Sequence, residues 1–284
     1  MLRNFRFHLA ILGFLALLGR MSAAQDTTDL FPARKGSLLC WTESLTSPRP
    51  LKIHFLKVDL TDGLEVFTLP GEDPDGTGPA ESTLTSPGDL LSRYHALAAV
   101  NANAFAGMPG TENDIRGWYR NRPVDIQGMV VSDGKVISPA QKERTPFWLD
   151  SQQHPHIGNP PAGEAPWQAV SDWSGPLLLG GRIVPDSTVT TLHPRTALGF
   201  DESGKWILIL VADGRQPGYS EGMSLHEMAV LLRSKGCTES LNLDGGGSSI
   251  MMYAGTDGQV HTVNSPSGML HRPVPVMLGI RRAD

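Results

Sequence analysis

At 284 residues the chain is long enough to bury a hydrophobic core as one large domain or two small ones. A net charge of −5 excludes the strongly basic surface typical of nucleic-acid binding, so no nucleic-acid partner is expected. The 31 glycines and 22 prolines favour turns and short strands over long helices, and no repeat of solenoid or propeller length stands out.

The N-terminus has the pattern of a signal peptide. Arg3 and Arg6 precede an apolar run over residues 9–18, and small residues at 22–24 offer a cleavage site. The run is shorter than the roughly 20 apolar residues that span a bilayer. The alternative is an uncleaved anchor or a buried helix. We expect residues 1–24 to be removed and residues 25–284 to form an exported domain, periplasmic or extracellular, that is not held in a membrane.

The first half of the mature chain reads as short strands with one helix. Residues 51–60 and 64–69 flank a Thr-Asp-Gly turn, which predicts a hairpin. Residues 87–94 carry a proline near their start, which predicts a short helix. Residues 96–100 form an apolar strand that runs into asparagines, and two short strands within 124–136 meet at an Asp-Gly turn.

Cys40 and Cys237 are the two cysteines of the chain. Export permits a disulfide, and a loop of this length would give about 5 kcal/mol of stability in the chain-entropy model. Two buried free thiols are the alternative, because sequence alone cannot bring the pair into contact. The sequence does not separate these two possibilities.

A strand-helix-strand unit is predicted in the second half. Residues 206–211 are an unbroken apolar run typical of a strand buried on both faces, and residues 224–235 have helical spacing with a capping box at their start. If the strands before and after this helix share a sheet, they run parallel and bring Asp213 and Asp244 to one edge. The expected fold class is α+β, a single domain of mixed and mostly short-stranded sheet in which this unit carries the site.

Two motifs compete for the active site. Gly218 to Gly222 match the Gly-x-Ser-x-Gly pattern of a serine esterase, but the strand does not run directly into Ser220 as a nucleophile elbow requires. The Gly-Gly-Gly-Ser-Ser run at 245–249 lies between two apolar strands, where a flexible linker is not expected. Glycines there let the backbone approach an anionic ligand, so we favour this second site.

Several stretches around these residues resemble the phosphodiester glycosidase family in content and order. They are Asn-Leu-Asp-Gly-Gly-Gly-Ser-Ser at 242–249, Asp-Gly-Arg at 213–215, Arg-Thr-Ala-Leu-Gly at 195–199, Ser-Glu-Gly-Met-Ser-Leu at 220–225, Asn-Ser-Pro-Ser at 264–267 and Arg-Pro-Val at 272–274. The resemblance spans nearly all of the mature chain. It departs at 101–105, where the family has an Asn-Gly-Gly-aromatic turn and this chain keeps the asparagine and the aromatic residue but replaces the glycines.

The resemblance implies hydrolysis of a sugar-1-phosphodiester. Together with the export expected from the N-terminal segment, this predicts an exported hydrolase with a role in envelope or extracellular polysaccharide metabolism. Asp213, Asp244 and Arg195 are the expected catalytic residues, the two carboxylates as acid, base or nucleophile and the arginine as a phosphate clamp. The expected substrate-binding residues are Asn101, Thr196, Gly214, Arg215, Gly245, Gly246, Gly247, Ser248, Ser249, Asn264 and Arg272.

No cofactor is required by this chemistry, but oxygen ligands at a phosphate site suit Mg²⁺ or Ca²⁺, and Asp213 with Asp244 would hold such a cation. The first alternative function is a non-catalytic polysaccharide-binding or export-associated protein, which would not need paired carboxylates. The second is a serine esterase that uses Ser220.

Overall fold

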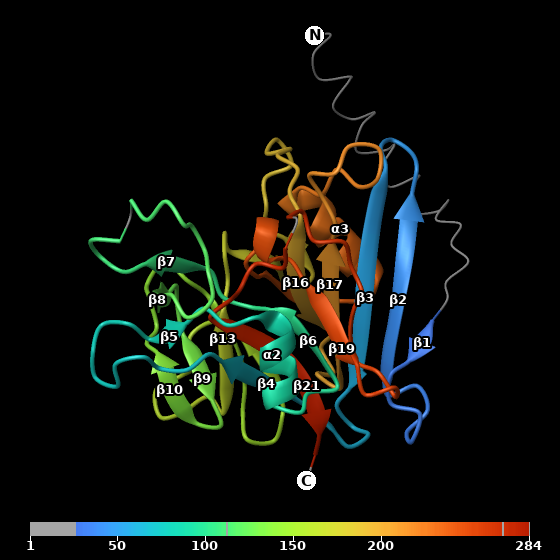
Figure 1. Cartoon of the computed structure of the whole chain (residues 1–284). Coiled ribbons are helices and arrows are strands. Elements are labelled where there is room, and N and C mark those ends of the chain that lie inside the picture. The colour runs from blue at the N-terminus through green and yellow to red at the C-terminus, as the bar shows by residue number, and fades with distance from the viewer. Residues whose placement is uncertain (1–26, 112, 269, 284) are drawn as a thin grey trace.

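The structure, a computed structural model, describes residues 27–111, 113–268 and 270–283, and the expected signal peptide lies outside them. Strands dominate these ranges and form four sheets in which every paired strand is antiparallel to its neighbour. Figure 1 shows the largest sheet beside the smaller ones. Two α-helices occur in the described ranges, α2 (Pro87–Arg93) and α3 (Leu225–Ser234).

The largest sheet has eight strands. In spatial order they are β1 (Thr28–Asp29), β2 (Leu38–Leu45), β3 (Leu51–Asp59), β17 (Trp206–Ala212), β16 (Arg195–Phe200), β18 (Glu239–Asn242), β14 (Pro176–Leu179) and β15 (Arg182–Ile183).

The other three sheets are smaller. One has the order β20 (Val260–Thr262), β19 (Met251–Ala254), β6 (Ala98–Asn101), β21 (Val276–Arg282) and β4 (Leu64–Pro70). The next has the order β10 (Lys135–Ser138), β9 (Val130–Ser132), β13 (Gln168–Ser171), β11 (Pro146–Leu149) and β12 (Pro155–Ile157). The last has the order β5 (Ser82–Thr83), β8 (Pro123–Ile126) and β7 (Phe105–Gly107).

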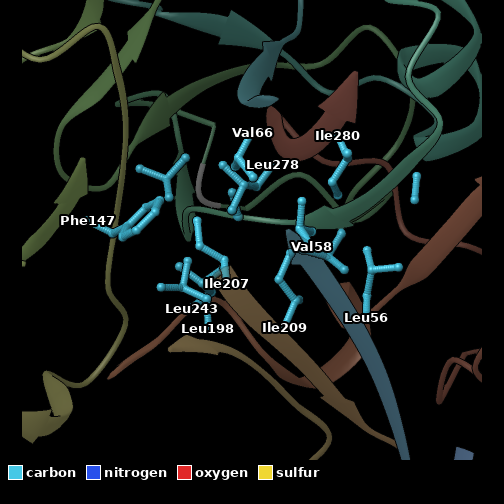
Figure 2. Packing of buried hydrophobic residues seen from close by; sticks show 14 of the residues in the cluster. Leu56, Val58, Val66, Phe147, Leu198, Ile207, Ile209, Leu243, Leu278 and Ile280 are labelled. Atoms are coloured by element: carbon cyan, nitrogen blue, oxygen red, sulfur yellow. The ribbon is translucent and has the colours of Figure 1, made fainter. Parts of the chain in front are cut away.

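Strand β17 shows how the layers are built, because its side chains alternate between two cores. Ile207, Ile209 and Val211 point into the main core, which side chains of β4, β6 and β21 complete from the opposite side. Figure 2 shows this packing, with Leu278 and Ile280 facing residues of β3, β16 and β17. Leu208 and Leu210 point the other way, toward α3. The prediction of a strand buried on both faces is therefore confirmed.

The two helices cover the outer faces of the sheets. Helix α3 packs its apolar face on the large sheet, and Ser224 and Glu227 form the predicted capping box at its start. Helix α2 begins at Pro87 and packs on the sheet of β4, β6, β19 and β21. The arrangement is helix, sheet, sheet, helix, with the main core between the two sheets.

The expected α+β fold class is wrong, because the chain is mostly β and its site is not built on a parallel strand-helix-strand unit. Helix α3 does connect β17 to β18, and these two strands do point the same way. Strand β16 lies between them and pairs antiparallel with both, so they share no hydrogen bonds. The predicted hairpin over 51–69 is also wrong, since β3 and β4 belong to different sheets.

Cys40 and Cys237 are free thiols, so of the two possibilities that the sequence leaves open the structure has the free pair and not the disulfide. Both are buried, Cys40 in the main core and Cys237 in the α3 core on the opposite face of the large sheet. Burial raises the pKa of the Cys40 thiol to about 11 and that of Cys237 to about 12. The two thiols therefore behave as packed apolar groups.

No helix in the described ranges is long and apolar enough to cross a bilayer.

Candidate active site

The candidate site lies at the edge of the large sheet where β17 and β18 end and β16 begins. Arg195, the first residue of β16, pairs with Ala212, the last residue of β17, so Asp213 follows directly beside it. Strand β18 ends at Asn242, which pairs with Ala197 of β16. Three chain segments that are distant in sequence thereby meet, and Asp213 and Asp244 leave the sheet at one edge although their strands are not adjacent.

Glycines allow the loops at this edge to pack backbone against backbone. A Cβ on Gly214 would lie 2.6 Å from the Pro194 nitrogen, and one on Gly245 would lie 2.8 Å from the Pro194 oxygen. Neither backbone can retreat without moving β16, so any larger residue would displace the loop. Close approach of backbone to backbone therefore explains Gly214 and Gly245, whereas Gly246 has a positive φ of 62° and a Cβ on Gly247 would meet the side chain of Arg272.

A cavity of about 330 Å³ opens at this edge, which is room for a small ligand. Its polar lining consists of arginines, a histidine, one carboxylate and the glycine turn, and its apolar lining consists mainly of aromatic rings. The lining residues are Ala104, Phe105, Trp118, Trp173, His193, Arg195, Arg215, Asp244, Gly245, Gly246, Gly247 and Arg272.

Positively charged groups predominate in the polar lining of the cavity. Among the described residues, Arg195, Arg215 and Arg272 form no salt bridge with a carboxylate. Arg195 Nε donates to the Met223 carbonyl at 3.2 Å, and Arg272 Nη1 lies 3.4 Å from the Ser248 hydroxyl oxygen. Guanidinium groups that are held by neutral partners keep donors and charge available for an anion, and their planar fork matches a phosphate.

The arginines influence one another and the nearby histidine. Burial lowers the pKa of Arg195, and the neighbouring Arg215 lowers it further. Burial also lowers the pKa of His193, as do Arg195 and Arg215. A neutral His193 fits its contact with Arg215, whose Nη2 lies 3.3 Å from Nδ1 of the imidazole. The pocket is therefore charged by guanidinium groups and not by the imidazole.

Asp244 is the one acidic residue among those that line the cavity. Burial raises the pKa of its carboxyl group, and the Ser248 side chain, the Gly245 amide and the charge of Arg272 oppose this shift. The Gly245 amide donates to Asp244 Oδ1 at 2.9 Å. A carboxylate with a raised pKa is a stronger base than one in water.

Asp213 is placed differently and is not among the cavity-lining residues. Its side chain is buried and surrounded by hydrogen-bond donors. His54 Nε2 lies 2.9 Å from Oδ2, and Oδ1 accepts from Asn264 Nδ2 and from the Ser265 amide, each at 3.0 Å. Tyr219 adds its hydroxyl at 3.5 Å from Oδ2.

These donors leave little free lone-pair capacity on Asp213 for a metal ion. The described residues also contain no group of three or more His, Cys, Asp and Glu side chains that could hold one. A divalent cation between Asp213 and Asp244 stays a prediction, and the donor set around Asp213 does not fit it.

Three residues expected to bind sugar lie behind the cavity. Asn101 Nδ2 donates to the Asp244 carbonyl at 2.7 Å, and its Oδ1 accepts from Thr196 Oγ1 at 2.7 Å and from the Ile250 amide at 3.1 Å. Asn264 Nδ2 donates to the Ser249 carbonyl at 3.1 Å as well as to Asp213. All three side chains are buried and engaged within the protein, where they hold the backbone of the site.

The glycine turn folds into a short 3₁₀ helix, η1 (Gly246–Ser248). The Gly246 amide donates to the Pro194 carbonyl at 2.9 Å, and the amides of Ser248 and Ser249 close the turn at 3.2 and 3.3 Å. Among the described residues, this leaves the Gly247 amide as the one backbone donor of the turn without a partner inside the protein. Both serine side chains are buried.

Ser220 does not have the geometry of a nucleophile. It is fully buried, its hydroxyl donates to the Asp213 carbonyl at 2.7 Å, and it accepts from the Lys52 amide at 3.0 Å. With its single proton engaged by a carbonyl, Ser220 ties the 213–220 loop to β3. The esterase motif is thus a structural contact.

Sequence reasoning missed five residues of the cavity wall. His193 precedes the Pro-Arg segment that opens β16, Ala104 and Phe105 end the Asn101 turn, and Trp118 and Trp173 lie on loops. A signal for the tryptophans was present, since each stands next to turn residues, in Gly117-Trp118 and in Trp173-Ser-Gly-Pro, where a core side chain is not expected.

The fold is shared with solved structures. The zebrafish N-acetylglucosamine-1-phosphodiester alpha-N-acetylglucosaminidase catalytic domain, auto-inhibited by its pro-peptide, matches with a TM-score of 0.63 and 19% identity over 92% of this chain and 84% of that chain. A hypothetical protein from Synechocystis matches with a TM-score of 0.62 and 15% identity, over 91% of this chain and 64% of that one. A putative exported protein from Burkholderia pseudomallei matches with a TM-score of 0.55 and 15% identity, over 84% and 75%.

Sequence comparison agrees with this. A 68-residue segment is 41% identical to the mouse N-acetylglucosamine-1-phosphodiester alpha-N-acetylglucosaminidase, and it spans 24% of this chain and 13% of the mouse protein. The family model described as phosphodiester glycosidase matches residues 94–281, more than half of the chain, and includes every segment that builds the cavity. The chain therefore belongs to the phosphodiester glycosidase family.

Proposed function

We propose that this protein hydrolyses a glycosyl phosphodiester, releasing the sugar and a phosphate monoester. The observation that carries the proposal is the convergence of Arg195, Arg215 and Arg272, none of them in a salt bridge within the described residues, on a cavity whose one acidic residue is Asp244. The enzymes from mouse and zebrafish, named for N-acetylglucosamine-1-phosphodiester cleavage, support the substrate class.

The three arginines would hold the phosphate, with the Gly247 amide as a further donor. As the bond between C1 of the sugar and the phosphate oxygen breaks, its electron pair passes to that oxygen, and the guanidinium groups stabilise the charge. A phosphate monoester stabilised in this way leaves without needing a separate acid, which fits a cavity lined by a single carboxylate.

Asp244 would act on the attacking water. The water oxygen bonds to C1, its proton passes to the carboxylate, and Asp244 later returns that proton to solvent. The raised pKa of Asp244 makes it a better base for this step. Asp213 would contribute by position, because its carboxylate joins the 213–216 loop to Asn264 and Ser265.

We further propose that the protein is exported and acts on envelope or extracellular polysaccharide. The arginine and apolar pattern of residues 1–24 supports export, as does the likeness to a Burkholderia protein described as a putative exported protein. Mass spectrometry of periplasmic or secreted material should find a mature N-terminus close to Gln25, and full-length protein recovered from the cytoplasm would contradict export.

The test of the activity is turnover of a panel of methyl sugar-1-phosphodiesters by the wild type and by Asp244→Asn. The substitution preserves shape but removes the base, so we expect a loss of at least about a hundredfold in kcat, the scale of general base catalysis. Ser220→Ala should keep most of the activity and is the matched control for a buried polar residue near the site. A wild type that binds the panel without turning it over would be a polysaccharide binder. An inactive Ser220→Ala variant, together with fluorophosphonate labelling of Ser220 in the wild type, would indicate an esterase.

A further inference from the structure

The cavity is lined by aromatic rings as well as by arginines. Trp118 and Trp173 both line it and are exposed to a similar degree, 37% and 39%, although large apolar side chains of this fold are mostly buried. Phe105 also lines the cavity and meets Trp118 edge to face, with ring centroids 4.9 Å apart. Exposed indoles gathered around a polar cavity are typical of ligand recognition.

Each indole is supported from behind by a guanidinium group. Arg144 lies 4.0 Å from the ring centroid of Trp173, and Arg122 lies 4.5 Å from that of Trp118. Neither arginine is among the residues that line the cavity. A cation stacked on an indole restricts the ring and leaves the remaining face available.

Trp173 is also fixed through its backbone. Its amide donates to the Asn242 carbonyl at 2.9 Å, and Asn242 Nδ2 donates in return to the Trp173 carbonyl. Asn242 ends β18 and begins the Asn-Leu-Asp-Gly-Gly-Gly motif, two residues before Asp244. The segment that carries the catalytic carboxylate therefore also sets the position of this indole.

We propose that Trp118 and Trp173 form a pyranose subsite, in which the apolar C–H face of a sugar ring stacks on indole while the attached phosphate is held by Arg195, Arg215 and Arg272. The proposal rests on the proposed function and adds to it the place of the sugar. A pyranose has hydroxyls at its edge and C–H groups on its face, which matches a cavity lined by both indoles and charged donors. Asn242 is then a positioning residue that acts through Trp173.

The experiment compares the binding of N-acetylglucosamine 1-phosphate, glucose 1-phosphate, inorganic phosphate and uridine monophosphate by isothermal titration. In the wild type at least one sugar phosphate should bind about tenfold more tightly than inorganic phosphate, the scale of one stacking contact. Trp173→Ala should remove most of this difference and leave the affinity for inorganic phosphate unchanged. Trp173→Phe should restore part of it, which separates a lost ring from a disturbed fold.

Trp167→Ala is the matched control, because Trp167 is also 39% exposed but packs against Gly134, away from the cavity. This variant should still bind the sugar phosphate more tightly than inorganic phosphate, by the same factor as the wild type. The subsite would be overturned if the wild type bound both sugar phosphates and inorganic phosphate equally well, or if only uridine monophosphate bound more tightly than inorganic phosphate. If the tighter binding of a sugar phosphate depends on Trp173 but no phosphodiester is turned over, the proposed activity is refuted and the subsite stands.

Discussion

The side-chain amide of Asn101 donates a 2.7 Å hydrogen bond to the main-chain carbonyl of Asp244, 143 positions away in the sequence. Asn101 is the last residue of β6, in one sheet, and Asp244 follows β18, in another. The same asparagine accepts from Thr196 of β16. One buried side chain thus links the two sheets at the point where the candidate base leaves the large sheet.

Asn101→Asp should therefore impair catalysis through position. The substitution keeps the oxygen that accepts from Thr196 but puts a carboxylate oxygen against the Asp244 carbonyl. We expect a fall of at least about tenfold in kcat and a loss of roughly 2 kcal/mol in stability, the cost of an unpaired buried polar group. Steady-state kinetics and urea unfolding measure both.

Thr196→Val is the control, since it removes a bond to Asn101 without disturbing the bond from Asn101 to Asp244. It should cost about 1 kcal/mol and leave kcat within a few fold. If Asn101→Asp turned over substrate at the wild-type rate, the hydrogen bond from Asn101 to Asp244 would not be needed for catalysis.

Local patterns in the sequence predicted local structure well. The apolar run before Asp213 predicted β17, and the capping box with helical spacing predicted α3, because both signals depend only on neighbouring residues. The glycine run was assigned to a site because it lies between two strands, and the structure places Gly245 to Gly247 on the cavity wall.

Pairing between strands was beyond the same reasoning. Nothing in the local pattern of residues 195–200 shows that β16 lies between β17 and β18, since strand order is set by contacts across the whole core. The direction in which the Asp213 side chain points is likewise set by contacts that are distant in the sequence. A carboxylate at a strand end can face the cavity or the interior, and only the buried partners His54 and Asn264 show that it faces the interior.

The raised pKa of Asp244 predicts a pH-dependent difference in stability between the wild type and Asp244→Asn. Burial favours the protonated form in the folded state, so the folded protein holds this proton more tightly than the unfolded chain. Its stabilising contribution is present below the unfolded pKa, near 3.8, and is lost as pH rises through the higher folded pKa.

Thermal unfolding of both proteins from about pH 3.5 to about pH 7 measures this contribution. The Tm of the wild type should fall relative to that of Asp244→Asn as pH rises, and other titrating groups cancel in the comparison because both proteins share them. A difference in Tm that stays constant over this range would contradict a raised pKa.

The pKa of His193 should change when an anion binds in the cavity. Its pKa is lowered by burial and by the charges of Arg195 and Arg215, and a bound phosphate offsets the two charges. The pKa of His193 should therefore rise when inorganic phosphate binds. Nuclear magnetic resonance titration of the imidazole nitrogens, with and without phosphate, follows this directly.

His154 serves as the internal reference for the phosphate-induced change in the spectrum, because it is exposed, pairs with Asp150 and does not line the cavity. Its resonances should be the same with and without phosphate. An unmoved His193 would place the anion away from Arg195 and Arg215.

Gly247→Ala should weaken phosphate binding without unfolding the protein. A Cβ at this position would lie 2.5 Å from Arg272 Nη2, at the far end of a flexible side chain, so the guanidinium group has to move while the backbone stays in place. We expect KM for the phosphodiester to rise about tenfold, the scale of one charged hydrogen bond, with Tm nearly unchanged.

Gly88→Ala is the matched control, since a Cβ there meets no atom closer than 3.8 Å and Gly88 lies in helix α2, where alanine favours the helix. Its Tm should stay the same or rise and its kinetics should match the wild type. If Gly247→Ala kept the wild-type KM, Arg272 would not be one of the groups that hold the phosphate.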